Sequence, residues 1–260
     1  MVNPTVVEAV QRMDRSQAHR GPDGNGFWSP VDGEDRQGVA LAHRRLAILD
    51  LTNAGAQPMI DPTTGTAIVF NGEAYNYRDI RAELGRHGFT FQSNCDTEVV
   101  LKAFIKWGVG CVERFRGMFA IAVWDPATKQ LHLARDRVGI KPLYIMPIEQ
   151  PTRGTTIFFA SELRSLLANG LAKFRLDPHG LATYLWNGFV VGPSTIVKGI
   201  ELLPAGTFVT IDAGQPMPAP TRYWRLPNAV AGSGRRGSTE QLRAQLLAAV
   251  KLRLIADVPL

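Results

Sequence analysis

The dipeptide Asn71-Gly72 is the clearest candidate for chemistry, because it directly follows an apolar run at residues 67–70. An Asn-Gly pair most often forms a tight turn. A β-hairpin would need a second alternating run after the turn, but residues 76–87 have helical periodicity instead. The sequence therefore predicts strand, short loop and helix, with the Asn71 amide and the Gly72 N–H free at the strand end. Two such donors can stabilise an oxyanion, and a plain turn is the alternative.

Three further side chains could take part in such chemistry, and each also has a structural explanation. Arg45 could bind a carboxylate bidentately, or it could be an exposed arginine on a strand. Asp96 could pair with a cation, or it could cap a helix over residues 97–107. Cys95 stands beside Asp96 with no evident histidine to activate its thiol, so we expect a small buried side chain and no nucleophile.

Strand and helix patterns alternate along the chain without a regular βαβ rhythm. We expect strands over residues 38–42, 46–51, 67–70, 118–124, 130–135, 156–160 and 206–211. Helices are expected near the N-terminus and over 76–87, 97–107, 161–168 and 178–187. The two runs within 118–135 surround an Asp125-Pro126 turn, which is typical of a hairpin. These elements indicate an α+β fold with a largely antiparallel sheet.

The last 35 residues differ from the rest of the chain. Residues 226–237 have the composition of a linker. Ser238 and Gln241 then have the spacing of a capping box, and Leu242, Leu246 and Val250 share one helical face. A new buried element is therefore expected to start here.

Composition and charge exclude several classes of protein. The 260 residues are 45% apolar and 20% charged, which suits a globular chain with a sizeable core. The net charge is +6, but the tightest basic groups hold only two residues, so we expect no nucleic-acid partner. Cys95 and Cys111 lack the spacing of a disulfide framework or a metal site. No apolar run could span a bilayer and the amphipathic start is unlike a signal peptide, so we expect no membrane partner and a cytoplasmic location.

Seven stretches stand out in order along the chain. They are AHRGPDGNG (18–26), LAHRRLAILDLTNAGAQPM (41–59), FNGEAYN (70–76), CDTEVVL (95–101), FRGMFAIAVWD (115–125), ARDRVGIKPLY (134–144) and FASELRSLL (159–167). Together they resemble the N-terminal glutaminase domain of glutamine-hydrolysing asparagine synthetase, a type-2 glutamine amidotransferase. The resemblance continues through residues 184–206 and 222–224 and so covers nearly the whole chain.

The resemblance implies a four-layer αββα sandwich of the N-terminal-nucleophile type with a glutamine pocket. It assigns the substrate carboxylate to Arg45 and the substrate α-amine to Asp96. It makes Asn71 and Gly72 the oxyanion hole, and Glu73 a further pocket residue. The same pocket is lined in the family by the stretch that corresponds to Leu46, Ala47, Ile48 and Leu49. Arg135-Asp136-Arg137 matches a family hallmark whose expected role is ion pairing, and His19 and His43 receive no catalytic role.

The family's nucleophile is a cysteine directly after the initiator methionine, and its own α-amine is the base. This chain begins Met1-Val2-Asn3, and the family's first strand and its SGGxDS loop for ATP do not occur in the 260 residues. We therefore expect a synthetase truncated at both ends. Residues 1–225 would be the glutaminase domain, and residues 226–260 would be a linker and the first helix of an absent synthetase domain. No catalytic residue, no metal ligand and negligible glutaminase activity are expected of this chain.

The complete family reaction converts aspartate, glutamine and ATP into asparagine, glutamate, AMP and diphosphate. ATP and magnesium would belong to the synthetase domain, so we expect no cofactor in this chain. The expected partners are L-glutamine, the synthetase domain and a second copy in a homodimer. Three alternatives stay open: a non-catalytic module like that of β-lactam synthetase relatives, a glucosamine-6-phosphate synthase relative, and a truncated product without function. The sequence also leaves open whether the acceptor is aspartate or a secondary metabolite.

Overall fold

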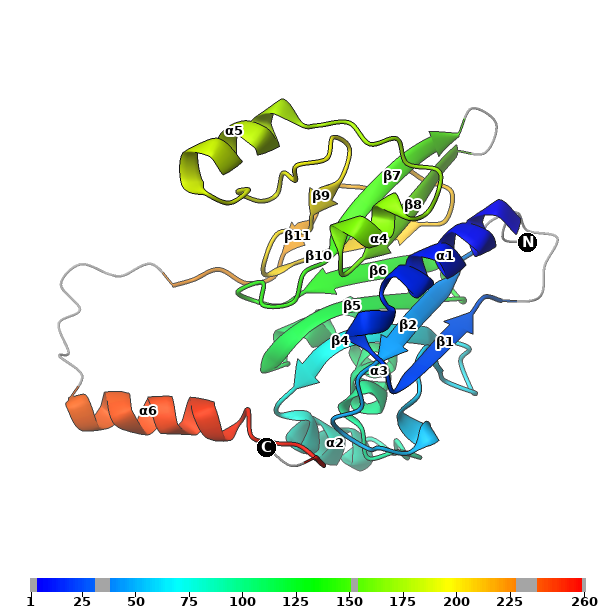
Figure 1. Cartoon of the computed structure of the whole chain (residues 1–260). Helices are drawn as coiled ribbons and strands as arrows, with labels where there is room; N and C mark the ends of the chain where they lie inside the picture. Colours follow the sequence, from blue (N-terminus) through cyan, green and yellow to red (C-terminus); the bar gives the residue numbers. More distant parts are fainter. Residues whose placement is uncertain (1–3, 31–37, 151–153, 228–237, 259–260) are drawn as a thin grey trace.

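A computed structural model describes residues 4–30, 38–150, 154–227 and 238–258, and the main body of these residues forms four layers (Figure 1). Two β-layers face each other in the middle. Helices α2 (Tyr77–Arg86) and α3 (Asp96–Trp107) cover the outer face of one β-layer. Helices α1 (Pro4–Ser16) and α4 (Leu163–Leu167) cover the outer face of the other. The expected four-layer αββα sandwich is confirmed.

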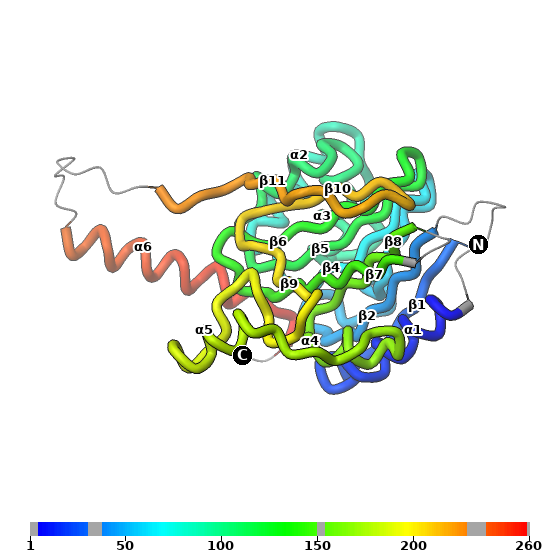
Figure 2. Tube along the Cα trace, turned by 90° about the horizontal axis from the view of Figure 1, so that it is seen from above, coloured from blue at the N-terminus to red at the C-terminus, as the bar shows by residue number. Residues whose placement is uncertain are grey.

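The larger sheet has six strands in the order β11-β10-β6-β5-β4-β3, and each neighbouring pair is antiparallel (Figure 2). Its central hairpin joins β5 and β6 around the Asp125-Pro126 turn, as the sequence predicts. The strands are β3 (Met59–Ile60), β4 (Ala67–Ala74), β5 (Gly117–Asp125), β6 (Gln130–Arg135), β10 (Thr207–Asp212) and β11 (Thr221–Arg222).

The opposite β-layer consists of two smaller antiparallel sheets. One has the order β8-β7-β9, and the other pairs β1 with β2. Among the described strands, β2 pairs only with β1 and β8 pairs only with β7, so each keeps one edge without a strand partner. The strands are β1 (Gly24–Trp28), β2 (Leu41–Arg45), β7 (Tyr144–Gln150), β8 (Gly154–Ala160) and β9 (Glu201–Leu202).

Three apolar clusters fill the spaces between the four layers. The first joins α2 and α3 to the six-stranded sheet, and Phe115 and Phe119 meet edge-to-face within it. The second lies between the two β-layers, and the third joins α1 and α4 to β7 and β8. A polar cavity described below interrupts the second cluster.

Several sequence predictions are confirmed, and others are wrong. Helix α5 (Pro178–Asn187) and strand β6 have the predicted bounds. The predicted strand at 46–51 is a loop. The strand expected to end at residue 70 continues to Ala74, because β4 stays paired with β5 through that residue. The 38–42 strand lies at 41–45, and β1 and β7 were not predicted.

The C-terminal helix α6 (Thr239–Lys251) starts with the predicted capping box, and both of its reciprocal hydrogen bonds are present. Leu242, Leu246 and Val250 are more than half exposed on this helix. Most of the predicted linker at 226–237 lies outside the described residues. In the part of the chain that the structure describes, no helix combines the length and the apolar character needed to cross a membrane.

Candidate functional site

A cavity of about 270 Å³ lies between the two β-layers. Eight of the nine predicted pocket residues line it, namely Arg45, Leu46, Ile48, Leu49, Asn71, Gly72, Glu73 and Asp96. Ala47 does not line the cavity, but its N–H donates to the Asp23 carboxylate at 2.9 Å and so helps to hold the loop. The fold therefore brings these eight residues, which are spread over positions 45 to 96, to one cavity. They come from β2, the loop after it, β4 and α3.

Strand β4 forms one wall of the cavity, and the alternation of its side chains decides which residues face the cavity. Ile68, Phe70 and Ala74 pack toward α2 and α3. Ala67 and Val69 pack toward the other β-layer. Because successive strand side chains point to opposite faces, Asn71 and Glu73 lie on the same face as Val69, which is the face toward the other β-layer.

The Gly72 N–H is a free donor for a different reason from the one predicted. Gly72 lies opposite Phe119, whose main-chain N and O are bonded to Asp136 at 3.2 and 2.8 Å and so point away from β4. In an antiparallel pair of this kind neither residue bonds across the ladder. The Gly72 N–H therefore points to the outer edge of β4, between the position where Gln57 bonds Phe70 and the position where Asp96 bonds Ala74.

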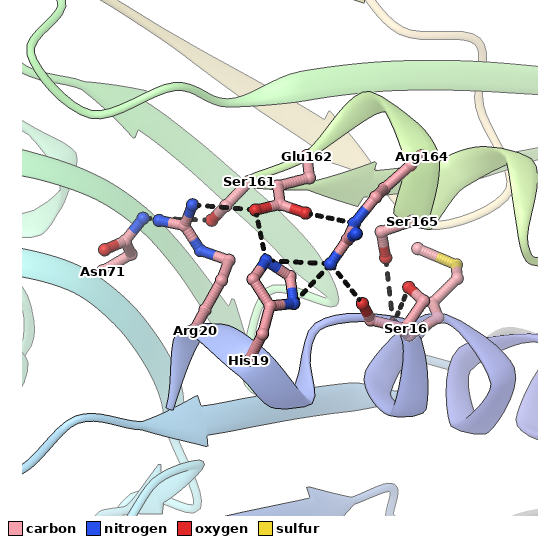
Figure 3. A network of polar contacts seen from close by, with 9 residues as sticks. Ser16, His19, Arg20, Asn71, Ser161, Glu162, Arg164 and Ser165 are labelled. Atoms are coloured by element: carbon pink, nitrogen blue, oxygen red, sulfur yellow. Dashed lines mark hydrogen bonds and ion pairs between the residues drawn. The ribbon is translucent and has the colours of Figure 1, made fainter. Parts of the chain in front are cut away.

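The Asn71 amide is oriented by a residue from the opposite β-layer. Its Nδ2 donates to the Ser161 hydroxyl at 3.1 Å (Figure 3). The next residue, Glu162, accepts hydrogen bonds from Arg20 and Arg164 and contacts His19. It thereby ties the short 3-10 helix η1 (Ala18–Arg20), which follows α1, to the start of α4. Burial would raise the pKa of Glu162, but these hydrogen bonds together lower it. This network fixes the wall against which the Asn71 amide rests.

Glu73 and Asp96 are two buried carboxylates that face the same space. Burial, followed by the nearby charge of Asp96, raises the pKa of Glu73 to about 7. Burial also raises the pKa of Asp96 to about 6, although its carboxylate accepts the Ala74 N–H at 2.9 Å. Glu73 Oε1 has no hydrogen-bond partner among the described residues. A cationic N–H donor placed between the two carboxylates would lower both raised pKa values and give Glu73 Oε1 a hydrogen-bond partner. The α-ammonium of an amino acid has that chemistry.

Arg45 organises the loop that forms the opposite wall. Its guanidinium donates to the carbonyls of Thr52 at 2.7 Å, of Leu49 at 3.4 Å and of Asp50. Gly55 allows this approach, because a Cβ there would lie 2.3 Å from Arg45 Nη2. The apolar stretch 46–51 is thus wrapped around the half-buried Arg45 guanidinium, which explains why it forms no strand.

Comparison with known proteins agrees with this geometry. A family model described as a glutamine amidotransferase domain matches residues 2–224. The chain belongs to this family.

Named relatives of this amidotransferase domain include several asparagine synthetases. It is 35% identical over 261 residues to asparagine synthetase 3 of Bacillus subtilis, covering 98% of this chain and 40% of the relative. It is 38% identical over 223 residues to a putative asparagine synthetase of Mycobacterium tuberculosis, covering 83% of this chain and 33% of the relative. It is also 33% identical over 267 residues to the amidase chry2 of Gibberella zeae, and this match covers 100% of this chain and 37% of the relative. The chain therefore spans only about a third to two-fifths of these relatives.

Solved structures show the same fold at lower identity. The glutamine phosphoribosylpyrophosphate amidotransferase of B. subtilis matches with a TM-score of 0.56 and 17% identity, over 86% of this chain and 47% of that chain. The mixed, antiparallel sandwich of this amidotransferase domain is therefore the fold of a known N-terminal-nucleophile glutamine amidotransferase.

Neither cysteine of the amidotransferase domain has an activated thiol. Cys95 lines the cavity, but burial raises its pKa, and its sulfur lies 3.0 Å from the Ser93 hydroxyl. Burial raises the pKa of Cys111 to about 12, and that residue lies in the core under α3. The cavity residue His43 is held neutral, since burial lowers its pKa to about 4. At neutral pH both thiols are therefore protonated, and the His43 imidazole is uncharged.

Within the Arg135-Asp136-Arg137 triplet, the side chains of Arg135 and Asp136 bond mainly to backbone groups. Burial lowers the pKa of Arg135, and the charge of Asp136 opposes this effect. The Arg135 guanidinium donates to the carbonyls of Gly139, Lys141 and Leu203 at 2.7–2.8 Å. The fully buried Asp136 accepts N–H bonds from Phe119, Val138, Ile140 and Lys141. An isolated sequence triplet carries no signal for such backbone partners, which lie on β5, in the loop directly after the triplet and beside β9.

Sequence reasoning missed three contributors to the site. Gln57 bonds both the N–H and the carbonyl of Phe70, so its side-chain amide ends strand pairing at the outer edge of β4. The N–H of Gly72, two residues further along that edge, is therefore accessible. Lys141 lines the cavity and lowers the pKa of Glu73 in opposition to burial. Ser161 orients the Asn71 amide. All three lie within the matched stretches, but only the folded chain brings them to β4.

Proposed function

We propose that this chain is the glutaminase part of an asparagine synthetase. It binds L-glutamine and, in the complete enzyme, supplies the ammonia for ATP-dependent amidation of aspartate. One observation carries the proposal: a single cavity combines two oriented amide donors, Asn71 Nδ2 and Gly72 N–H, with the carboxylates of Glu73 and Asp96.

In this proposal each group of glutamine has a counterpart in the cavity. The α-ammonium lies between Glu73 and Asp96, whose charges it neutralises. The α-carboxylate lies at the wall built by Arg45 and the loop after it. The side-chain amide oxygen faces Asn71 and Gly72, which hold the negative charge that develops on it during hydrolysis.

The reaction then needs a nucleophile that the 260 residues do not provide, because Cys95 and Cys111 are internal and have no α-amine of their own. In the family mechanism a cysteine thiolate attacks the amide carbon and the oxygen takes the negative charge. The C–N bond breaks, the α-amine delivers a proton to the leaving ammonia, and water hydrolyses the thioester to glutamate. Among the described strands, β2 and β8 each have an edge without a strand partner, and residues of both strands line the cavity. We propose that an extended segment with that cysteine lies between them.

The remaining parts of the proposal concern the rest of the enzyme. Residues 1–225 form the glutaminase domain, and α6 is the first helix of the synthetase domain, which would hold ATP and magnesium. Glutamine and that domain are the partners. Support comes from the asparagine synthetases to which the chain is similar over 83–98% of its length.

Calorimetry with the purified 260-residue chain tests the proposal. L-Glutamine should bind and D-glutamine should not, and no glutamate should form, since removal of a catalytic nucleophile costs on the order of a millionfold in rate. Asn71→Ala should weaken binding less than Asp96→Ala, because its donor acts mainly on the transition state. Absence of L-glutamine binding would favour the non-catalytic module, and clear turnover would sink the claim of inactivity.

A second candidate keeps the pocket and changes the ammonia acceptor. The similarity to the amidase chry2 over the whole chain supports an acceptor other than aspartate. Glutamine binding would be the same in both cases, so product analysis of the complete enzyme with aspartate and ATP distinguishes them.

A further inference from the structure

The segment after α6 returns to the body of the molecule and contacts the pocket loop (Figure 1). The Asp257 N–H donates to the Ile48 carbonyl at 2.9 Å. In return, the Asp257 carboxylate accepts the Asp50 N–H at 2.8 Å. These reciprocal bonds join two segments that lie about 200 residues apart in the chain.

The same segment also contacts the other wall of the pocket. The Arg253 guanidinium lies 5.3 Å from the ring centre of Tyr75, which directly follows β4. Ile255 packs against the apolar cluster beneath α2 and α3. Residues 253–257 therefore bridge the end of β4 and the loop at 46–50, which are the two sides of the cavity.

The loop depends on such bonds, because it makes few apolar contacts. Leu46 and Ile48 line the cavity but are 57% and 38% exposed. Asp50 has a positive φ of 51°, a conformation that non-glycine residues adopt only when neighbouring contacts hold them. Its carboxylate accepts bonds from Thr52 and from the Asn94 N–H, so Asp257 completes the set by binding the Asp50 N–H.

We propose that Asp257 is a positioning residue for the glutamine pocket, and that docking of residues 252–258 and occupancy of the pocket stabilise each other. Linkage makes this coupling reciprocal: if the docked segment strengthens ligand binding, the ligand must strengthen docking by the same factor. Any domain joined through this segment would then sense whether the pocket is filled. The identity of the ligand rests on the proposed function, whereas the ordering of the loop by Asp257 does not.

Residue-resolved amide exchange by NMR on the 260-residue chain tests the first half. Asp257→Ala should speed exchange of the Asp50 amide, because its acceptor is gone. Asp257→Asn keeps an acceptor oxygen and should give an intermediate rate. The matched control is Asp212→Ala, which removes an exposed carboxylate on β10 that accepts a hydrogen bond from the Gln130 side-chain amide. It should leave the Asp50 amide unchanged. Unchanged exchange in Asp257→Ala overturns the positioning role.

Calorimetry with L-glutamine tests the coupling. Asp257→Ala should weaken binding about fivefold to tenfold, at the low end of typical coupling between sites, and Asp257→Asn should restore most of it. Saturating L-glutamine should slow exchange of the Asp257 amide in the unmodified chain. Faster Asp50 exchange with unchanged affinity overturns the coupling. If the unmodified chain binds no glutamine, the proposed function fails, and the exchange rates still decide the role of Asp257.

Discussion

The two walls of the pocket are held by different kinds of interaction. Asn71, Gly72 and Glu73 belong to β4, which pairs with β5 at eight successive positions. Among the described strands, none pairs with the facing loop at 46–52, and polar bonds with Arg45, Asp23, Asn94 and Asp257 hold it. The sheet wall is therefore part of the framework of the fold, whereas the loop wall is attached to that framework by polar bonds.

Because of this difference, ligand binding and folding stability should respond differently to changes in the two walls. A register shift of one residue would turn Asn71 and Glu73 away from the cavity, so the sheet wall cannot adjust without unfolding. The loop can lose one bond and keep the others. Changes to the backbone of the sheet wall should thus reduce both ligand binding and folding stability, whereas changes to the loop should reduce binding alone.

Gly72→Ala should have the largest effect. A Cβ at this position would lie 2.0 Å from the Met118 carbonyl oxygen and 2.7 Å from the Phe119 Cα, and neither backbone atom can move like a side chain. We expect the free energy of unfolding to fall by about 1–3 kcal/mol and L-glutamine binding to be lost, as measured by urea denaturation and calorimetry. Gly85→Ala in α2, where a Cβ meets nothing within 4 Å, is the control and should not destabilise the chain. Equal stability of both variants would contradict the framework role of β4.

Asp96→Asn removes a charge from the pocket while the backbone stays in place, so it separates the charge of the site from the framework of the sheet. We expect L-glutamine to bind roughly tenfold to a hundredfold more weakly at pH 8, since a hydrogen bond to a charged group contributes about 1.5–3 kcal/mol. The free energy of unfolding should not fall, because the buried carboxylate is costly when ionised. Asp79→Asn, on the first turn of α2, is the control. Loss of stability without loss of binding would assign Asp96 to the fold alone.

The pH dependence should run in opposite directions for binding and for stability. The pKa values of Glu73, about 7, and Asp96, about 6, lie above their ordinary values, so the folded chain holds more protons than the unfolded chain. The free energy of unfolding should therefore fall as pH rises from about 4.5 to 7. Glutamine affinity should rise about tenfold from pH 5.5 to 8 as both groups ionise, because one pKa unit corresponds to about 1.4 kcal/mol. Calorimetry in buffers of different ionisation enthalpy should detect proton release, and Glu73→Gln should flatten the upper part of the curve.

The sheet wall could be predicted from the sequence better than the loop wall. The two runs on either side of the Asp125-Pro126 turn predicted β5 and β6 as a hairpin, which is confirmed. Asn71-Gly72 was expected in a loop at the end of a strand, but both residues lie within β4. Residue types do not reveal that Gln57 would cap the edge of that strand. Motif resemblance supplied the pocket residues, which local patterns alone left undecided.

The loop wall could not be predicted because its determinants are distant in sequence. The stretch 46–51 reads as a strand, since four of its residues are large and apolar. Its actual shape follows from the carbonyl contacts of Arg45 and from the single carboxylates of Asp23 and Asp257. Long-range polar bonds of this kind leave no periodic signal in a sequence.

Asp23→Ala should have the smallest effect and so tests the loop wall alone. Its exposed carboxylate accepts the Ala47 N–H, and loss of such a bond should cost less than about 1 kcal/mol, seen as a twofold to threefold weaker L-glutamine affinity with unchanged urea denaturation. Combining it with Asp257→Ala removes both outer supports of the loop. If the supports act on one shared loop conformation, the double variant should lose more affinity than the sum of the single losses in free energy. Additive losses would mean that each end of the loop is held independently.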